Sequence, residues 1–171
     1  MAEKIKEMPY KEAWEKLISD YMVSMGSLYK HLKNTYGEEG LVSYLKNVEI
    51  ARFREYFKSF TSKMESFLGK IIPGKAFQEK MLGIANEFQF FLGVGNIEVS
   101  ELDSEKGVAR LKYCPYQRAF LTAPEKVRTE REFYCKYQCG VYIKGVCEEV
   151  LGFNISFEPQ KEGCIYRISR K

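Results

Sequence analysis

Residues 134–169 read YCKYQCGVYIKGVCEEVLGFNISFEPQKEGCIYRIS, and this stretch decides the fold. Its first part belongs to a predicted helix from Glu130 to Leu151, in which apolar residues recur at helical spacing until Gly152 stops it. Phe153–Glu158 and Cys164–Ser169 then alternate as paired strands do, with a turn between them. The end of the chain therefore predicts a helix that leads directly into a β-hairpin.

The preceding residues extend this pattern toward the N-terminus. Three amphipathic helices are predicted, a first hairpin follows, and a short helix leads into the last part of the chain. The helices cover Pro9 to about Gly37, Glu38 to about Phe67 (with a stop at Ile71–Gly74) and Lys75–Phe91; the hairpin pairs Gly95–Ser100 with Val108–Tyr113, and the short helix is Tyr116–Leu121. This order predicts a single α+β domain over residues 1–171, with a helical part at about 9–91 and a hairpin–helix–hairpin part at about 95–170. We expect the N-terminal helices to cover an antiparallel sheet made of the two hairpins.

Length and charge narrow the class of protein. With 171 residues the chain can build one core without needing a metal or a disulfide to fold. Its charged first residues and the lack of a membrane-length apolar run predict a cytoplasmic protein with reduced thiols. The net charge of +4 is mild, and we interpret Lys126, Arg128 and Arg131 as a solvated face, so nothing favours a nucleic-acid partner.

Four of the five cysteines form the strongest chemical signal: Cys114, Cys135, Cys139 and Cys164. Cys135 and Cys139 share one face of a helix within roughly 40°, so both thiols can reach one ion. If the two hairpins are neighbours in one sheet, Cys114 and Cys164 can join them. Cys147 is rotated by roughly 80° from Cys139 and is interpreted as a core residue.

The chemistry of this cysteine set leaves alternatives open. Four thiolates from helix and hairpins are typical of a closed structural zinc site, and an iron–sulfur cluster is the alternative. Buried inert thiols would need no metal at all. A catalytic thiolate is poorly supported, because the only histidine, His31, is far away in the sequence on the first helix and is expected at the surface.

The C-terminal motifs resemble a known family. Tyr134–Gly145, Glu148–Gly152, Ile155–Glu158 and Gly163–Ile168 are similar to a 4-vinyl reductase (4VR) domain, which has a helix with a small-residue pattern, a Leu-Gly turn and a hairpin bearing Glu, Gly and Cys. Ser24–Glu39 and Cys114–Pro115 are similar to proteins of the 2-amino-thiazoline-4-carboxylate hydrolase-like family. The resemblance covers the last third of the chain well and the remainder loosely.

The resemblance implies a ligand and a metal set. Domains of the 4VR family bind small, often aromatic or hydrocarbon ligands beneath a helical cover. In the phenol-sensing members, three cysteines and one glutamate hold zinc, and Cys135, Glu158 and Cys164 match three of these positions. Lys161 stands where the remaining cysteine is expected. Cys139 and Cys114 are the substitutes, which leaves Glu158 as a fifth candidate or as an acceptor behind the ligands.

We therefore predict a domain that binds or senses a small apolar or aromatic ligand, with a structural metal site at the cysteines. Such a sensor would act through a homodimer or a partner protein. The alternative is a metal-dependent hydrolase or reductase acting on a small ring compound. We favour the binding domain because four thiolates would close zinc against water, and no residue is singled out as catalytic. A second alternative is an iron–sulfur protein or an assembly module that works through protein contacts.

Overall fold

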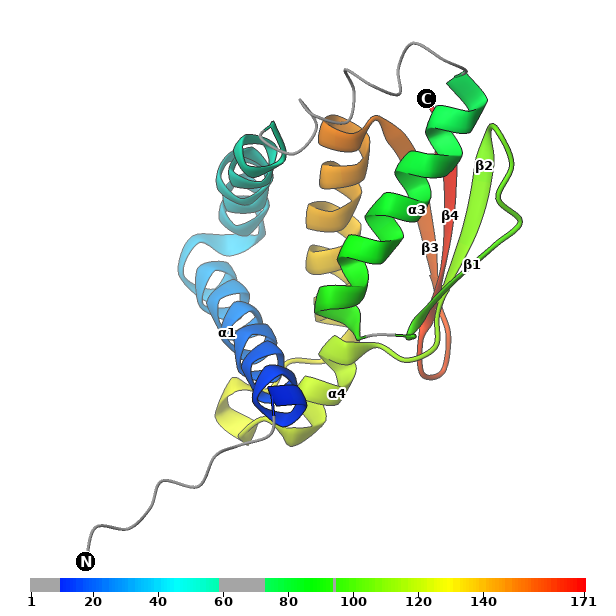
Figure 1. Ribbon diagram of the computed structural model, residues 1–171. Helices are drawn as coiled ribbons and strands as arrows, with labels where there is room; N and C mark the ends of the chain where they lie inside the picture. The colour runs from blue at the N-terminus through cyan, green and yellow to red at the C-terminus, as the bar shows by residue number, and fades with distance from the viewer. Residues whose placement is uncertain (1–9, 59–72, 94) are drawn as a thin grey trace, which may run out of the picture.

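The computed structural model describes residues 10–58, 73–93 and 95–171. The chain alternates between helical and β segments (Figure 1). In chain order the elements are α1 (Tyr10–Tyr44), η1 (Leu45–Ile50), α3 (Pro73–Leu92), β1 (Ile97–Ser100), β2 (Lys106–Leu111), α4 (Pro115–Thr122), η2 (Glu125–Val127), α5 (Arg131–Tyr134), η3 (Cys135–Ile143), η4 (Val146–Leu151), β3 (Phe153–Pro159) and β4 (Cys164–Arg170). The α+β class predicted from the sequence is confirmed.

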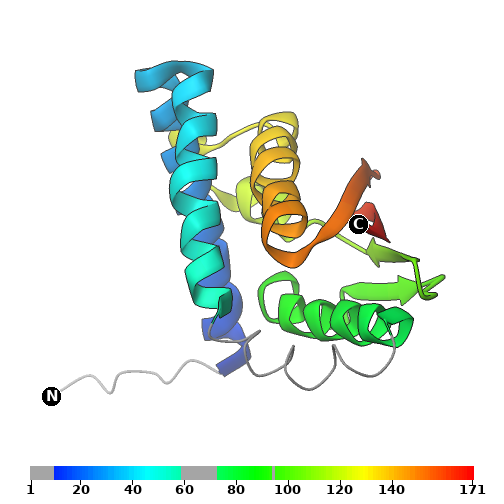
Figure 2. The ribbon, with the colours of Figure 1, turned by 90° about the horizontal axis from the view of Figure 1, so that it is seen from above.

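The first two predicted helices form a hairpin. Gly37 interrupts α1 with φ 73° and ψ −176°, a conformation that glycine adopts without strain, so the predicted break near Gly37 is confirmed. The helix after this break runs through η1 to residue 58 and lies antiparallel beside the first half of α1 (Figure 2). Its expected continuation to Phe67 lies outside the described residues.

The start of α3 differs from the sequence prediction. The third helix was expected from Lys75, whereas α3 begins at Pro73; the predicted end of the preceding helix lies outside the described residues. Proline suits this position because its fixed φ fits the first helical turn and its missing N–H has no intrahelical acceptor there.

The long helix between the hairpins is the centre of the molecule. α5, η3 and η4 follow one another from Arg131 to Leu151, and Gly152 ends the run in the left-handed conformation with φ 75°. This confirms the predicted helix and its stop. Much of it has the wider π-helical hydrogen bonding, which is rare and often marks functional sites. We call residues 131–151 the central helix.

The two hairpins join into one antiparallel sheet with the strand order β1-β2-β4-β3. β2 and β4 are the central pair, and their register places Leu111 opposite Cys164 and Ala109 opposite Tyr166. Because side chains alternate between the faces of a strand, Phe153 and Ile155 share one face, and both are buried there. The residue between them, Asn154, is exposed on the other face.

The helices cover this sheet in layers. α3 and the central helix lie directly on the inner face, where Phe77 and Met81 of α3 join Val146, Leu151 and Phe153 in the main core. α1 packs on α4, η2 and η3, so the central helix lies between the helical hairpin and the sheet (Figure 2).

A glycine allows α1 and α4 to approach closely. A Cβ atom added to Gly26 would lie 2.2 Å from Cζ of Phe120. Hydrogen alone at this position therefore leaves room for the ring of Phe120, which is 5 % exposed.

None of the described helices combines the length and the apolar character needed to cross a membrane.

Candidate functional site

Cys114 is the residue that immediately precedes α4, and Pro115 begins that helix. Asn96 holds in place the backbone that leads to Cys114. Its side-chain amide donates to the carbonyls of Leu92 (2.6 Å) and Tyr113 (3.0 Å) and accepts from the N–H of Tyr113 (3.0 Å). Asn96 is 2 % exposed, so these bonds form in the interior and tie the end of α3 to the residue before Cys114.

The other three predicted cysteines come from the central helix and the sheet. Cys135 and Cys139 lie in η3, and Cys164 is the first residue of β4. Each of Cys114, Cys139 and Cys164 interacts electrostatically with Cys135, and Cys139 also interacts with Cys114 and Cys164. The four sequence-predicted cysteines therefore lie in the same region of the molecule; we call them the thiol cluster.

The geometry of the thiol cluster is not that of a metal site as it stands. Within the described residues, no group of three or more His, Cys, Asp or Glu side chains is arranged to hold a metal ion. The donor chemistry nevertheless suits a thiophilic metal, because the four sulfurs come from three separate elements. All five cysteines are free thiols.

Burial keeps the thiols of Cys114, Cys139 and Cys164 protonated in the absence of a cation. It raises the pKa of Cys114, raises that of Cys139 strongly, and raises that of Cys164 to about 11, with the neighbouring thiols adding to each shift. Hydrogen bonds to the sulfurs oppose these shifts and favour thiolate. They come from the backbone N–H groups of Tyr116 and Gln117 to Cys114, from the N–H of Glu158 to Cys164 and from the side chain of Tyr166 to Cys139.

The carboxylate of Glu158, the fifth candidate, lies apart from the thiol cluster. Glu158 is exposed, pairs with Arg167 at 3.7 Å and accepts a hydrogen bond from the side chain of Gln160 at 3.1 Å. In β3 it alternates with Phe157 and thus points to the outer face of the sheet. Its backbone N–H, not its carboxylate, contacts Cys164.

Cys147 and His31, which are not among the predicted metal ligands, lie in the core and at the surface, as the sequence predicts. Cys147 is 6 % exposed and belongs to the main core, away from the other thiols. His31 is exposed on α1.

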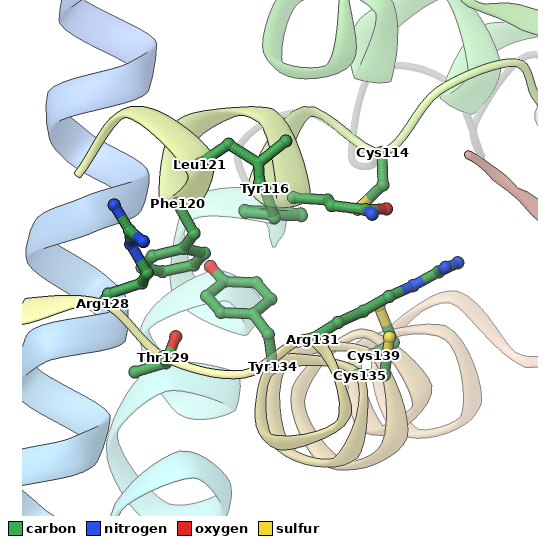
Figure 3. Close-up of a pocket in the computed structure, with 11 residues that line it drawn as sticks. Cys114, Tyr116, Phe120, Leu121, Arg128, Thr129, Arg131, Tyr134, Cys135 and Cys139 are labelled. Atoms are coloured by element: carbon green, nitrogen blue, oxygen red, sulfur yellow. The ribbon is translucent and has the colours of Figure 1, made fainter. Parts of the chain in front are cut away.

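A cavity of about 160 Å³ lies between α4 and the start of the central helix, beside the thiol cluster (Figure 3). Three rings form one wall: the centroid of Tyr134 is 4.4 Å from that of Tyr116 and 5.1 Å from that of Phe120. Cys114, Cys135 and Cys139 also line the cavity, which brings thiols and aromatic rings to the same space.

The cavity lining carries buried polar atoms that lack partners. Among the described residues, Gln117 Oε1, Thr129 Oγ1, Arg131 Nε and the hydroxyl of Tyr134 are all inaccessible and form no hydrogen bond within the protein. All four residues line the cavity. A buried polar group without a partner costs about 1–3 kcal/mol, and because these four atoms are inaccessible, a molecule in the cavity would not reach them in this conformation.

Arg131 corrects an expectation from the sequence. It was interpreted as part of a solvated basic face, but it is only partly exposed and its guanidinium holds the turn between β3 and β4. Its Nη groups donate to the carbonyls of Gln160, of Lys161 (3.1 Å) and of Gly163 (3.1 Å). The carbonyl of Glu162, the fourth in this turn, accepts from the N–H of Cys114 (2.6 Å). The turn that precedes Cys164 is thus fixed to both other cysteine-bearing elements.

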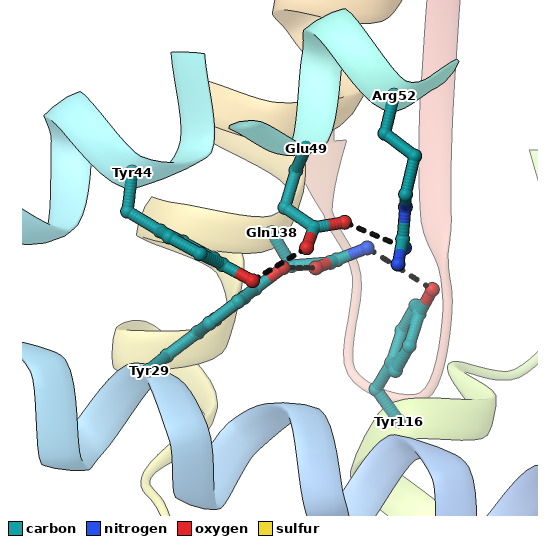
Figure 4. A network of polar contacts seen from close by, with 6 residues as sticks. All are labelled: Tyr29, Tyr44, Glu49, Arg52, Tyr116 and Gln138. Carbon is teal, nitrogen blue, oxygen red and sulfur yellow. Dashed lines mark hydrogen bonds and ion pairs between the residues drawn. The ribbon is translucent and has the colours of Figure 1, made fainter. Parts of the chain in front are cut away.

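A buried polar network connects the cavity to the helical hairpin (Figure 4). The hydroxyl of Tyr29 donates to Oε1 of Gln138 at 2.7 Å, and Nε2 of Gln138 donates to the hydroxyl of Tyr116 at 3.4 Å. Burial raises the pKa of Tyr29 and of Tyr116 far above the ordinary value, so both remain protonated donors at neutral pH.

A buried carboxylate lies on the hairpin side of this network. Glu49 in η1 is 3 % exposed, accepts from the hydroxyl of Tyr44 at 2.6 Å and pairs with Arg52 at 2.7 Å. Burial, followed by the hydrogen bond with Glu49, raises the pKa of Tyr44 to about 12. No motif in the sequence points to Glu49 or Gln138, since each is one polar residue within an amphipathic helix.

No protein-family model matches the chain, and a search of curated proteins gives no match either. The similarity to 4VR domains noted in the sequence thus remains a prediction.

Proposed function

We propose that this protein is a small-molecule-binding or sensor domain whose ligand occupies the cavity between α4 and the central helix. The observation that carries the proposal is the cavity itself, one wall of which is formed by the rings of Tyr116, Phe120 and Tyr134. An apolar or aromatic ligand would pack against these rings. A cavity of roughly 150 Å³ holds benzene, so the volume of about 160 Å³ suits a compound of one ring.

The thiol cluster is the second part of the proposal. We infer that Cys114, Cys135, Cys139 and Cys164 bind one zinc ion, with an iron–sulfur cluster as the alternative. The support is that four thiols from three elements lie in one region of the molecule, and that hydrogen bonds to the sulfurs of Cys114, Cys139 and Cys164 favour thiolate. The metal would brace the wall of the cavity. We also infer a cytoplasmic location, where thiols stay reduced and can bind a metal.

Two measurements on the purified full chain test these assignments. Native mass spectrometry should detect a bound small compound, or one-ring compounds at millimolar concentration should raise the thermal midpoint by mass action. An empty protein whose midpoint no such compound moves contradicts the binding function.

Elemental analysis addresses the metal. We expect about one zinc per chain, lost in the C135A/C139A variant and retained in C147A, because Cys147 lies in the core away from the thiol cluster. Protein without zinc or iron, or with the same metal content in both variants, refutes the metal site.

A further inference from the structure

Tyr116 belongs both to the wall of the cavity and to the buried polar network. Its ring lies in the wall, with its centroid 4.4 Å from that of Tyr134. Its hydroxyl accepts a hydrogen bond from Nε2 of Gln138 at 3.4 Å, and Oε1 of Gln138 accepts from the hydroxyl of Tyr29 at 2.7 Å (Figure 4). Neither Gln138 nor Tyr29 is among the described residues that line the cavity, so Tyr116 presents its ring to the cavity and its hydroxyl to the network.

The cavity offers the hydroxyl of a ligand little to donate to. Of the described residues that line it, four carry an oxygen in the side chain: Tyr116, Gln117, Thr129 and Tyr134. The oxygens of the last three are inaccessible, and that of Tyr116 already accepts from Gln138. The other acceptors among the lining side chains are cysteine sulfurs, which accept only weakly. An O–H group placed in the cavity therefore meets no available side-chain oxygen among the described lining residues.

We propose that Gln138 determines which ring compounds the cavity accepts, by holding the hydroxyl of Tyr116 in the polar network. The inference rests on the proposed function and adds a selectivity to it: apolar one-ring compounds are preferred over hydroxylated ones of the same size. Gln138 is a positioning residue, because it acts on the ligand only through Tyr116. Its amide is itself held by Tyr29, which is 0 % exposed, so the orientation of Tyr116 is set before the ligand arrives.

The test compares toluene with phenol, in which a hydroxyl replaces the methyl group on the same ring, by calorimetric titration of the full chain at pH 7. An O–H group buried without an acceptor predicts that toluene binds roughly 10- to 100-fold more tightly than phenol in the wild-type protein. In Q138L the hydroxyl of Tyr116 loses its donor and meets an apolar side chain, so the ring turns into the cavity and its oxygen accepts from phenol. The ratio of the two affinities should then fall toward one. Adding Y116F to Q138L removes this oxygen and should restore the preference for toluene.

The matched control is Y44F. Tyr44 donates to the buried Glu49 at 2.6 Å, and neither residue is among those that line the cavity, so Y44F should lower stability and leave the ratio unchanged. A merely structural role of Gln138 would likewise lower the stability of Q138L without moving the ratio. Q138M, whose side chain is unbranched like that of glutamine, carries the same expectation as Q138L and takes its place where Q138L does not fold.

Three results overturn the inference while toluene binding leaves the binding function intact. They are equal affinity for toluene and phenol in the wild-type protein, a ratio in the folded Gln138 variant that equals the wild-type ratio, and a ratio that stays near one after Y116F is added. If neither probe binds at millimolar concentration, the binding function fails, and the role of Gln138 fails with it.

Discussion

Replacing Tyr29 by phenylalanine isolates the buried bond that connects α1 to the central helix. Tyr29 is 0 % exposed and Gln138 is 6 % exposed, so water cannot replace the hydroxyl that Y29F removes. Oε1 of Gln138 would then lack its 2.7 Å donor, at a cost of about 1–3 kcal/mol in the free energy of unfolding. The Q138L variant strands the hydroxyl of Tyr29 in the same way and should cost a similar amount.

The double variant Y29F/Q138L decides whether these costs arise from one bond. Since it removes both partners, its cost should fall short of the sum of the single costs by about 1–2 kcal/mol. The assay is urea denaturation at pH 7 at one fixed metal content, and Y36F is the control because Tyr36 is 66 % exposed and should change stability by less than about 0.5 kcal/mol. Additive costs, or a cost for Y29F no larger than that for Y36F, refute the reasoning.

Two further predictions concern the turn before Cys164 and the buried thiol of Cys147. A Cβ atom on Gly163 would lie 1.8 Å from the carbonyl oxygen of Leu111, so G163A should lower the free energy of unfolding by about 3 kcal/mol or more. A Cβ atom on Gly140 would have its nearest contact at 3.4 Å, so the control G140A should be neutral or stabilising by up to about 1 kcal/mol. Equal urea midpoints for the two variants would contradict this prediction. Burial, followed by the charge of Glu148, raises the pKa of Cys147 to about 12, above its unfolded value of about 8.5. The stability that this neutral thiol contributes to the fold is therefore complete below about pH 8.5 and is lost as the pH rises toward 12. The stability difference between wild type and C147A should therefore shrink by about 1.4 kcal/mol per pH unit between about pH 9 and 11, and a difference that stays constant over this range disproves the assignment.

Local chemistry is what made much of the fold predictable. Gly152 ends the central helix because glycine tolerates the left-handed conformation there, and Gly37 breaks α1 for a related reason. Apolar residues at helical or alternating spacing show which segments must bury one face, whatever lies opposite. α3 begins two residues before the predicted Lys75, because proline suits the first turn of a helix as well as the end of the one before it.

The candidate site was likewise predictable only where it depends on local structure. The composition and spacing of the cysteines predicted a set of four thiols without Cys147, since a helix fixes which of its residues share a face, and metal binding by these four stays a prediction. That the four are neighbours depends on β2 pairing with β4, a contact between segments more than fifty residues apart. Spacing could not have predicted the outward carboxylate of Glu158, because the face of a strand residue depends on its register in the sheet.

The sequence by itself determined the order of the helices and strands and the α+β class. Only the tertiary structure decided that Arg131, Gln117 and Thr129 line a cavity with Cys114, Cys135 and Cys139. The reason is physical: helices and turns follow from interactions over a few residues, which the sequence displays directly. Whether an arginine is solvated or holds a turn from inside depends on which distant backbone carbonyls the fold brings to it.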